Sequence, residues 1–321
     1  MSSFKYNNVY IKNYESIVGP KESNSNIKFK NTIEDYYYNE KNIEDAEIKM
    51  QEFCLNKLTS KTNNIPLVIG GDLLNQITAT SYNLNNKNIP FLGIYTACAT
   101  FNEGLIILSN FIESKMINNG IVITSSHNLN AERQFRYPVE YGCPKKKYTT
   151  FTTTGAVGAY LSNEVSNIKI ESSTIGTVVD YGIKDVSNMG AVMAPSASHT
   201  LHKHLTELNR SIDYYDLIIT GDLGSYGSEL FLKLIKEEHN YIPKNYYDAA
   251  SILYNNDEYQ GGSGPVVAPL ILFNKIINEN IHHKILILAT GSLHNTLMTN
   301  LKKSIPAITH AVSIEVMKWN T

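Results

Sequence analysis

The residue with the clearest chemical setting in this sequence is Cys98, which lies among small residues in the segment 95–100, YTACAT. The apolar run 91–94 predicts a strand before it, and the apolar residues of 105–108 predict a helix after it. Small residues permit a tight turn from strand to helix, which places the sulfur at a helix N-terminus. There the helix dipole and free N–H groups lower the pKa of a thiol and can hold an anion. Single buried cysteines are usually inert, but this setting favours a functional Cys98, whereas Cys54 and Cys143 are expected to be inert.

Polar residues that follow other predicted strands form a second set of candidates. Asp72 follows the apolar run 65–69, and His127 comes directly after another short apolar run. His127 is as consistent with a structural histidine as with one that lines a pocket. Further along, Arg133 and Arg136 lie beside aromatic residues. Their forked guanidinium groups suit carboxylates, although surface salt bridges are an equally good explanation.

The sequence predicts neither a metal site nor a disulfide framework. The three cysteines are far apart, odd in number and outside any CxxC pattern. His199, His202 and His204 fall on one predicted helix, but their spacing does not put all three on one face. We therefore expect no bound metal and no cofactor of the protein's own.

An internal repeat dominates the organisation of the chain. The segment 67–73, LVIGGDL, recurs as LIITGDL at 217–223, and each copy follows a predicted helix. The next helix, strand and turn also recur in both copies. Helices that alternate with strands predict right-handed crossovers and parallel sheets, with functional groups at the C-terminal ends of the strands. We therefore predict an α/β fold of two duplicated halves, residues 1–165 and 166–321.

Composition and charge exclude several classes of protein. The chain has 28 Lys and Arg against 30 Asp and Glu, so no global field attracts nucleic acid. The N-terminus has no apolar h-region, and no apolar stretch reaches the roughly 18 residues that a membrane-spanning helix needs. We expect a protein without signal peptide or transmembrane helix that stays inside the compartment where it is made.

Motifs spread over nearly the whole chain after about residue 18 resemble those of the stage V sporulation protein AD family. The resemblance implies a thiolase-like fold, with two mixed, mostly parallel sheets and shared buried helices in αβαβα layers. GDLLNQ at 71–76 and AERQFRYP at 131–138 are the most specific motifs. The others are YTACAT at 95–100, TSSHN at 124–128, MGAVMAPSASHT at 189–200, YDLIITGDLG at 215–224, QGGSG at 260–264 and SIPAITHAVSIE at 304–315.

The resemblance also implies a function. Dipicolinic acid, pyridine-2,6-dicarboxylate, is expected to bind with or without calcium in a pocket descended from a condensing-enzyme active site, for uptake into the developing spore. The implied partners are the other subunits of the spore dipicolinate channel complex, with the protein peripheral to the inner spore membrane; a homodimer is also compatible. By motif, Asp72 and Cys98 are the positions expected to line that pocket.

A condensing enzyme needs more than its cysteine. It uses a histidine base or donor and a second His or Asn that holds the enolate or oxyanion. In the ketoacyl synthases these groups follow second-half strands, and here the corresponding segments 221–224 and 260–264 contain neither His nor Asn. We therefore predict binding without catalysis, and a Cys98 pocket with no histidine base. The predicted ligand-binding residues are Asp72, Cys98, His127, Arg133, Arg136, Asp222 and Ser263.

The sequence leaves two alternatives open. One is a ketoacyl synthase or thiolase type of acyltransferase that uses Cys98 with His127 or His294. The other is a purely structural subunit that binds no ligand. Under the binding hypothesis, replacement of Cys98 or Asp72 is expected to weaken binding without unfolding the chain, because both residues are predicted in loops at strand ends.

Overall fold

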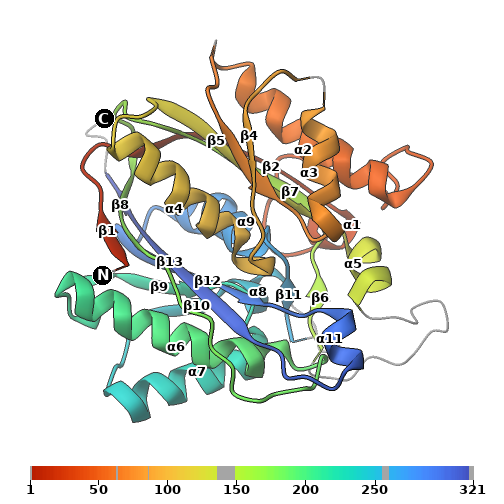
Figure 1. The fold of residues 1–321 in the computed structure, drawn as a ribbon. Coiled ribbons are helices and arrows are strands. Elements are labelled where there is room, and N and C mark those ends of the chain that lie inside the picture. The colour runs from red at the N-terminus through yellow and green to blue at the C-terminus, as the bar shows by residue number, and fades with distance from the viewer. Residues whose placement is uncertain (1, 63, 86, 136–148, 255–259, 318–321) are drawn as a thin grey trace.

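The first half of the chain forms five neighbouring strands in the spatial order β4-β3-β5-β7-β2 (Figure 1). The computed structural model describes residues 2–62, 64–85, 87–135, 149–254 and 260–317. Four of the five strands run in one direction and β7 opposes them. The strands are β2 (Tyr10–Val18), β3 (Val68–Gly71), β4 (Phe91–Gly93), β5 (Asn119–Ser126) and β7 (Gly155–Ser162), and the helices are α1 (Pro20–Ser23), α2 (Ile43–Thr59), α3 (Thr78–Leu84), α4 (Thr100–Glu113) and α5 (Asn128–Phe135).

The second half repeats this order as β10-β9-β12-β13-β8, again with one strand, β13, opposing the other four. Asp72 and Asp222 consequently lie at equivalent places, just after β3 and β9, the second strand of each order. The strands are β8 (Ile168–Thr174), β9 (Leu217–Thr220), β10 (Tyr246–Asp248), β12 (Lys284–Ser292) and β13 (Ala307–Val316), and the helices are α6 (Met189–Leu208), α7 (Gly224–His239), α8 (Ala249–Leu253), α9 (Val267–Ile271), α10 (Ile277–Glu279) and α11 (Thr296–Asn300).

The two predicted sheets are joined into one. Strand β2 pairs with β8 at Tyr10–Lys169 and Ile11–Ile168, so the ten strands form a continuous sheet, to which β1 (Ser3–Lys5) adds beside β8. A separate small sheet pairs β6 (Phe151–Thr152) with β11 (Gly262–Ser263). A junction of two residue pairs is too short to leave a sequence pattern, which is why separate sheets were expected.

The elements stack in five layers, as predicted for this fold class. Figure 1 shows, from top to bottom, α2 and α3, the first-half strands, α4 and α9, the second-half strands, and α6 and α7. Helix α4 contacts strands of both halves. Its buried Phe101 meets Phe273 edge to face at 6.1 Å, and Phe273 stacks on Tyr14 at 4.4 Å. The shared apolar layer therefore holds the halves together and fixes the N-terminus of α4.

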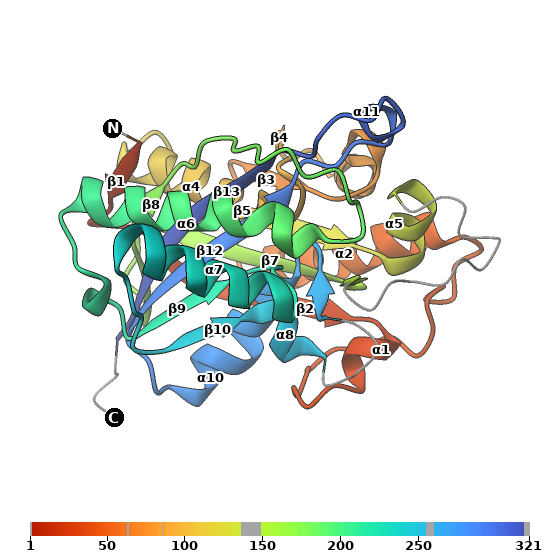
Figure 2. The ribbon, with the colours of Figure 1, turned by 90° about the horizontal axis from the view of Figure 1, so that it is seen from below.

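Helices α6 and α7 lie side by side on the outer face of the second half (Figure 2). Their backbones meet at Gly190 and Gly227, where a Cβ on Gly227 would lie only 2.7 Å from the Cα of Gly190. Asn188 begins α6 by accepting a hydrogen bond from the N–H of Ala191, as an N-cap residue does.

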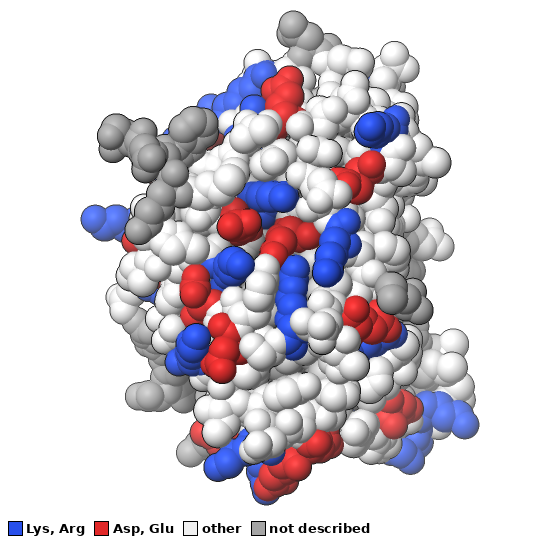
Figure 3. Space-filling view, turned by 90° about the vertical axis from the view of Figure 1, so that its left-hand side faces the viewer, with Lys and Arg blue, Asp and Glu red and all other residues white. Residues whose placement is uncertain are grey.

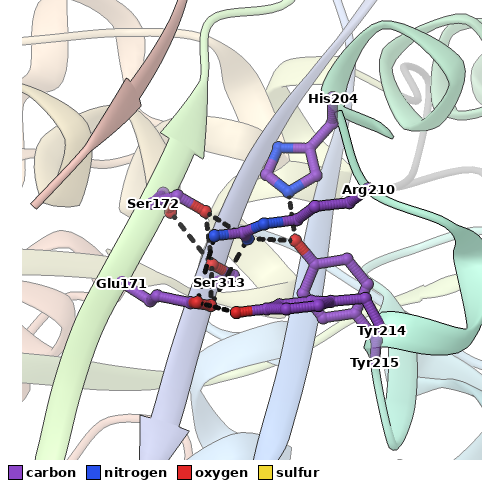
Figure 4. Close-up of polar contacts among 7 residues, drawn as sticks. All are labelled: Glu171, Ser172, His204, Arg210, Tyr214, Tyr215 and Ser313. Atoms are coloured by element: carbon purple, nitrogen blue, oxygen red, sulfur yellow. Dashed lines mark hydrogen bonds and ion pairs between the residues drawn. The ribbon is translucent and has the colours of Figure 1, made fainter. Parts of the chain in front are cut away.

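A buried ion pair ties the loop after α6 to the sheet (Figure 4). Arg210 donates to Glu171 Oε1 and Oε2 at 3.0 and 3.3 Å, to Ser172 Oγ at 2.9 Å and to Tyr215 Oη at 2.7 Å. Burial, with the charge of Arg210 adding to it, lowers the pKa of His204 to about 3, so this imidazole is neutral. Tyr215 accepts from Arg210, and its hydroxyl lies at hydrogen-bond distance, 2.6 Å, from Nε2 of His204.

Charges on the face drawn in Figure 3 alternate in sign, with Lys and Arg interspersed among Asp and Glu. The described residues of that face form no broad basic patch of the kind that binds nucleic acid. Within the described part of the chain, no helix is both long and apolar enough to cross a membrane.

Candidate functional site

Cys98 lies in a single 3-10 turn, Ala97–Ala99, directly before α4. This confirms the predicted strand, tight turn and helix N-terminus. Ala97 has a φ of 52°, a left-handed conformation that is uncommon for residues other than glycine. Such strained backbone clusters at functional sites, where the surrounding structure holds it in place.

Two glycines from different halves hold this turn by direct backbone contact. A Cβ on Gly71, at the end of β3, would lie 2.1 Å from the carbonyl oxygen of Ile94. A Cβ on Gly291, near the end of β12, would lie 2.2 Å from the carbonyl oxygen of Thr96. Both approaches are possible only without a side chain, so the position of Cys98 depends on strand ends from both halves.

Cys98 faces a small cavity of about 40 Å³ to which both halves contribute. The first half supplies the turn itself and α5, while the second half supplies β11, the start of α6 and the segment after β12. The lining residues are Leu73, Tyr95, Ala97, Cys98, Ala131, Phe135, Thr152, Met189, Ser263, Ser292 and His294. The duplicated fold thus brings together residues that lie almost 200 positions apart.

His294 is a histidine among the lining residues of this cavity. The prediction that no histidine acts as a base for Cys98 stays a prediction. Its ring packs against Phe135, with 5.7 Å between the ring centroids. The sequence held a signal for it, because TGSLHN at 290–295, across the end of β12, resembles TSSHN at 124–128, across the end of the equivalent strand β5. The recurrence of the strands and of these turns was recognised, but it was not extended to the two histidines.

Ser263, one of the predicted ligand-binding residues, lines the cavity. Asp72, another of them, does not line it. The buried Asp72 carboxylate accepts from Leu74 N–H at 2.9 Å, and from the N–H and hydroxyl of Thr80 at 2.8 and 2.7 Å. These bonds close the turn after β3 and fix the start of α3. These hydrogen bonds give Asp72 a structural role, and its contact with a ligand stays a prediction.

Replacement of Asp72 by alanine is therefore expected to destabilise the fold, by about 1 to 3 kcal/mol, because two buried donors of Thr80 and the partly buried N–H of Leu74 lose their acceptor. The free energy of unfolding, measured by urea titration, tests this. Asp213→Ala removes an exposed carboxylate and serves as the control, with an expected change below about 0.5 kcal/mol. Equal stabilities of the two variants would contradict the structural role.

Asp222 is also buried and does not line the cavity. Burial, and then the charge of Asp248, raises the pKa of its carboxyl well above the usual value. The turn after β9 is closed by Asp248 instead, which accepts from Leu223 and Gly224 N–H at 3.0 and 2.9 Å. Asp72 and Asp222 therefore have different structural roles, although they occupy equivalent positions in the two halves.

His127 and Arg133 are not among the lining residues of the cavity. The buried His127 contacts the carbonyl oxygen of Tyr36 through Nε2 at 2.8 Å, and burial lowers the pKa of its ring, as in a structural histidine. Arg133 is half exposed and pairs with Glu44 of α2. Arg136 lies outside the described residues.

The comparisons with known proteins identify the family. The model of the Stage V sporulation protein AD (SpoVAD) family matches residues 2–315. The chain belongs to the SpoVAD family. It is 35% identical, over 96% of its length and 94% of the relative's, to Stage V sporulation protein AD of Bacillus subtilis (strain 168).

Solved structures confirm the thiolase-like fold of this SpoVAD family member. A single-residue variant of OleA from Xanthomonas campestris superposes with a TM-score of 0.64 at 12% identity, covering 97% of this chain and 99% of that one. 3-Oxoacyl-[acyl-carrier-protein] synthase III from Aquifex aeolicus VF5 gives a TM-score of 0.55 at 15% identity, covering 98% and 99%. At these identities the likeness establishes the fold alone.

A buried acid supports the cavity wall in this SpoVAD family member, and sequence reasoning missed it. Glu47 of α2 accepts from the hydroxyl of Ser125 at 3.0 Å and from the amide of Asn130 on α5 at 2.8 Å. Burial, and then the charge of Asp72, raises the pKa of Glu47 to about 8. Because α5 carries Ala131 and Phe135 into the cavity, Glu47 positions that wall.

The stability of this SpoVAD family member is expected to fall by at least about 2 kcal/mol between pH 6.5 and 8. Burial raises the pKa of Glu22 to about 7 and, with Asp72, that of Glu47 to about 8, so the folded state holds protons that the unfolded state releases above about 4.5. The stability that each of these retained protons contributes is lost as the pH rises through the pKa of the group in the folded state. Histidines with lowered pKa add little here, because they are neutral in both states above about 6.5.

Urea unfolding at pH 6.5, 7.2 and 8 measures this slope in the wild type and in Glu47→Gln. The variant has no titrating group at position 47, so its slope should be shallower whatever its absolute stability. Parallel slopes would show that Glu47 is already ionised at neutral pH.

Proposed function

We propose that this protein binds dipicolinic acid for uptake into the developing spore and does not catalyse acyl transfer. Membership of the SpoVAD family supports the biological role. The observation that carries the proposal is the cavity at Cys98, where the side chains of Thr152, Ser263, Ser292 and His294 converge near the N-terminus of α4. Hydroxyl and imidazole groups donate hydrogen bonds to carboxylates, and a helix N-terminus favours an anion.

The cavity also offers aromatic surfaces that suit the flat ring of dipicolinate. Tyr95 and Phe135 bring aromatic surfaces to the same cavity, which suit a planar heteroaromatic ring. Cavities that combine apolar walls with a few converging polar groups are the usual form of small-molecule sites.

Direct titration of the purified protein with dipicolinate in a calorimeter tests the proposal, with and without calcium chloride. Benzene-1,3-dicarboxylate keeps both carboxylates but lacks the ring nitrogen, and should bind more weakly. Cys98→Ala should lose only part of the affinity, because the backbone N–H groups and the helix dipole remain, the dipole contributing about 0.3 to 2 kcal/mol. No heat with dipicolinate under either condition would reject the proposal.

A second candidate function is acyl transfer through Cys98, and the presence of His294 in the same cavity favours it. Condensation also needs a further group to hold the enolate or oxyanion. Incubation with acyl-CoA followed by mass spectrometry separates the two functions. An acyl adduct on Cys98 would establish the transferase, whereas dipicolinate binding without any adduct supports the binding protein.

We infer that the biological partners are the other subunits of the spore dipicolinate channel complex, at the periphery of the inner spore membrane. Calcium, where it takes part, is proposed to arrive with the ligand. Among the residues that the structure describes, no group of three or more His, Cys, Asp or Glu could hold a metal ion. Spores that carry a binding-deficient variant should contain less dipicolinate and be more sensitive to heat.

A further inference from the structure

The Cys98 cavity is too small for the ligand of the proposed function. Its volume is about 40 Å³, whereas a cavity of about 150 Å³ is known to admit a single benzene ring. A pyridine ring with two carboxylates is larger than benzene. At least one wall must therefore move before such a ligand can reach Cys98.

The wall that separates this cavity from a much larger one is formed by Tyr95, Phe135 and His294, which line both. The outer groove on the far side has a volume of about 600 Å³, within the range of small-molecule sites. It is bordered by the turn after β3, the end of β4 and the segment before α11, and its described lining contains no Asp, Glu, Lys or Arg. Carboxamides supply most of its polar groups, from Asn75, Gln76, Gln134 and Asn295.

Phe135 is the part of this wall best placed to move. It is the last residue of α5, and its ring meets that of His294 at an interplanar angle of 52°, without close stacking. Its neighbour Gln134 anchors the helix end by accepting from Asn75 N–H at 2.9 Å and donating to the Leu73 carbonyl at 2.7 Å. Rotation about the side-chain bonds of Phe135 can therefore occur while Gln134 keeps α5 in position.

The opposite side of the groove holds strained backbone. Gln76 and Ile77 have φ values of 60° and 50°, and the left-handed region is a genuine outlier for a β-branched residue. Strain of this kind is retained at ligand clamps and switch regions. Here the strained backbone turns Gln76 toward the groove. Gln134 is hydrogen-bonded to Leu73 and Asn75, which precede Gln76 in the chain.

We propose that the outer groove is the route by which a planar heteroaromatic acid reaches Cys98, and that Phe135 is the gate that sets the size limit. Rotation of Phe135 away from His294 joins the two spaces. The ligand then places one carboxylate among the hydroxyls of the inner cavity and extends its other end toward the carboxamides. The identity of the ligand rests on the proposed function, whereas the route and the gate rest on the two cavities and their shared wall.

Alkylation of Cys98 tests the route without any dipicolinate. The full-length protein is treated with iodoacetamide and, separately, with the bulky N-(1-pyrenyl)maleimide, and peptide mass spectrometry follows Cys98 apart from the other two cysteines. Phe135→Ala should raise the rate with the maleimide by about tenfold, which corresponds to removal of a barrier of about 1.4 kcal/mol. Phe135→Trp should lower it, and Asn75→Trp, which fills the groove, should slow both reagents.

Tyr247→Ala is the matched control, because Tyr247 lies on β10, at the opposite end of the sheet from β4. Rates for the three groove and gate variants equal to that of Tyr247→Ala would overturn the proposal, whatever the affinity for dipicolinate. Altered alkylation rates together with no dipicolinate binding would reject the proposed function and leave the route in place. Thermal unfolding of each variant excludes general loosening as the cause of faster alkylation.

Discussion

Replacing Arg210 by alanine is expected to lower the free energy of unfolding by about 3 to 5 kcal/mol. Only 9% of the Arg210 side chain and 14% of the Glu171 side chain are exposed, so the change leaves a carboxylate largely out of water without its cation. Tyr215 and Ser172 lose a charged donor at the same time. Guanidinium titration at pH 7, followed by circular dichroism, measures the loss.

Arg133→Ala provides the matched control for this prediction. Its ion pair with Glu44 has side chains that are 50% and 38% exposed, and exposed pairs contribute at most about 1 kcal/mol. The double variant Arg210→Met with Glu171→Met should be less destabilised than Arg210→Ala, because no unpaired charge stays buried. A loss of less than about 1 kcal/mol in Arg210→Ala would mean that water reaches Glu171 in the folded protein.

The elements that the sequence predicted best are those with a local cause. The turn at Cys98 follows from small residues between an apolar strand and an apolar helix, and the repeated GDL segments follow from one arrangement used twice. Both are visible within about ten consecutive residues. The internal duplication could therefore be predicted from the sequence.

The direction in which a side chain points at a strand end could not be predicted from the sequence. Asp72 and Asp222 occupy equivalent positions, yet Asp72 closes its own turn while Asp248, from the next strand, closes the other. The choice depends on which donors the following helix presents, and these are fixed only in three dimensions. Glu47 was missed for a related reason, because an acid on the buried face of a helix contradicts the periodicity that predicts the helix.

His294→Ala is expected to weaken dipicolinate binding by about 10- to 100-fold, since a hydrogen bond to a charged group contributes about 1.5 to 3 kcal/mol. In the proposed complex His294 is the cavity's imidazole donor to a carboxylate, and it also forms the wall against Phe135. Calorimetric titration of dipicolinate into the wild type and the variant measures the loss. The variant should fold normally, because His294 lies in the segment between β12 and α11 and not in a strand or helix.

Two further variants separate the donor role from the wall. His294→Gln keeps an N–H donor and should recover part of the affinity, whereas His294→Leu keeps the bulk without a donor and should bind as weakly as His294→Ala. His199→Ala removes an exposed histidine on α6 and should bind like the wild type. If His294→Leu binds as tightly as the wild type, the imidazole only fills space, and the carboxylate must be held by the hydroxyls of Ser263 and Ser292 together with the N-terminus of α4.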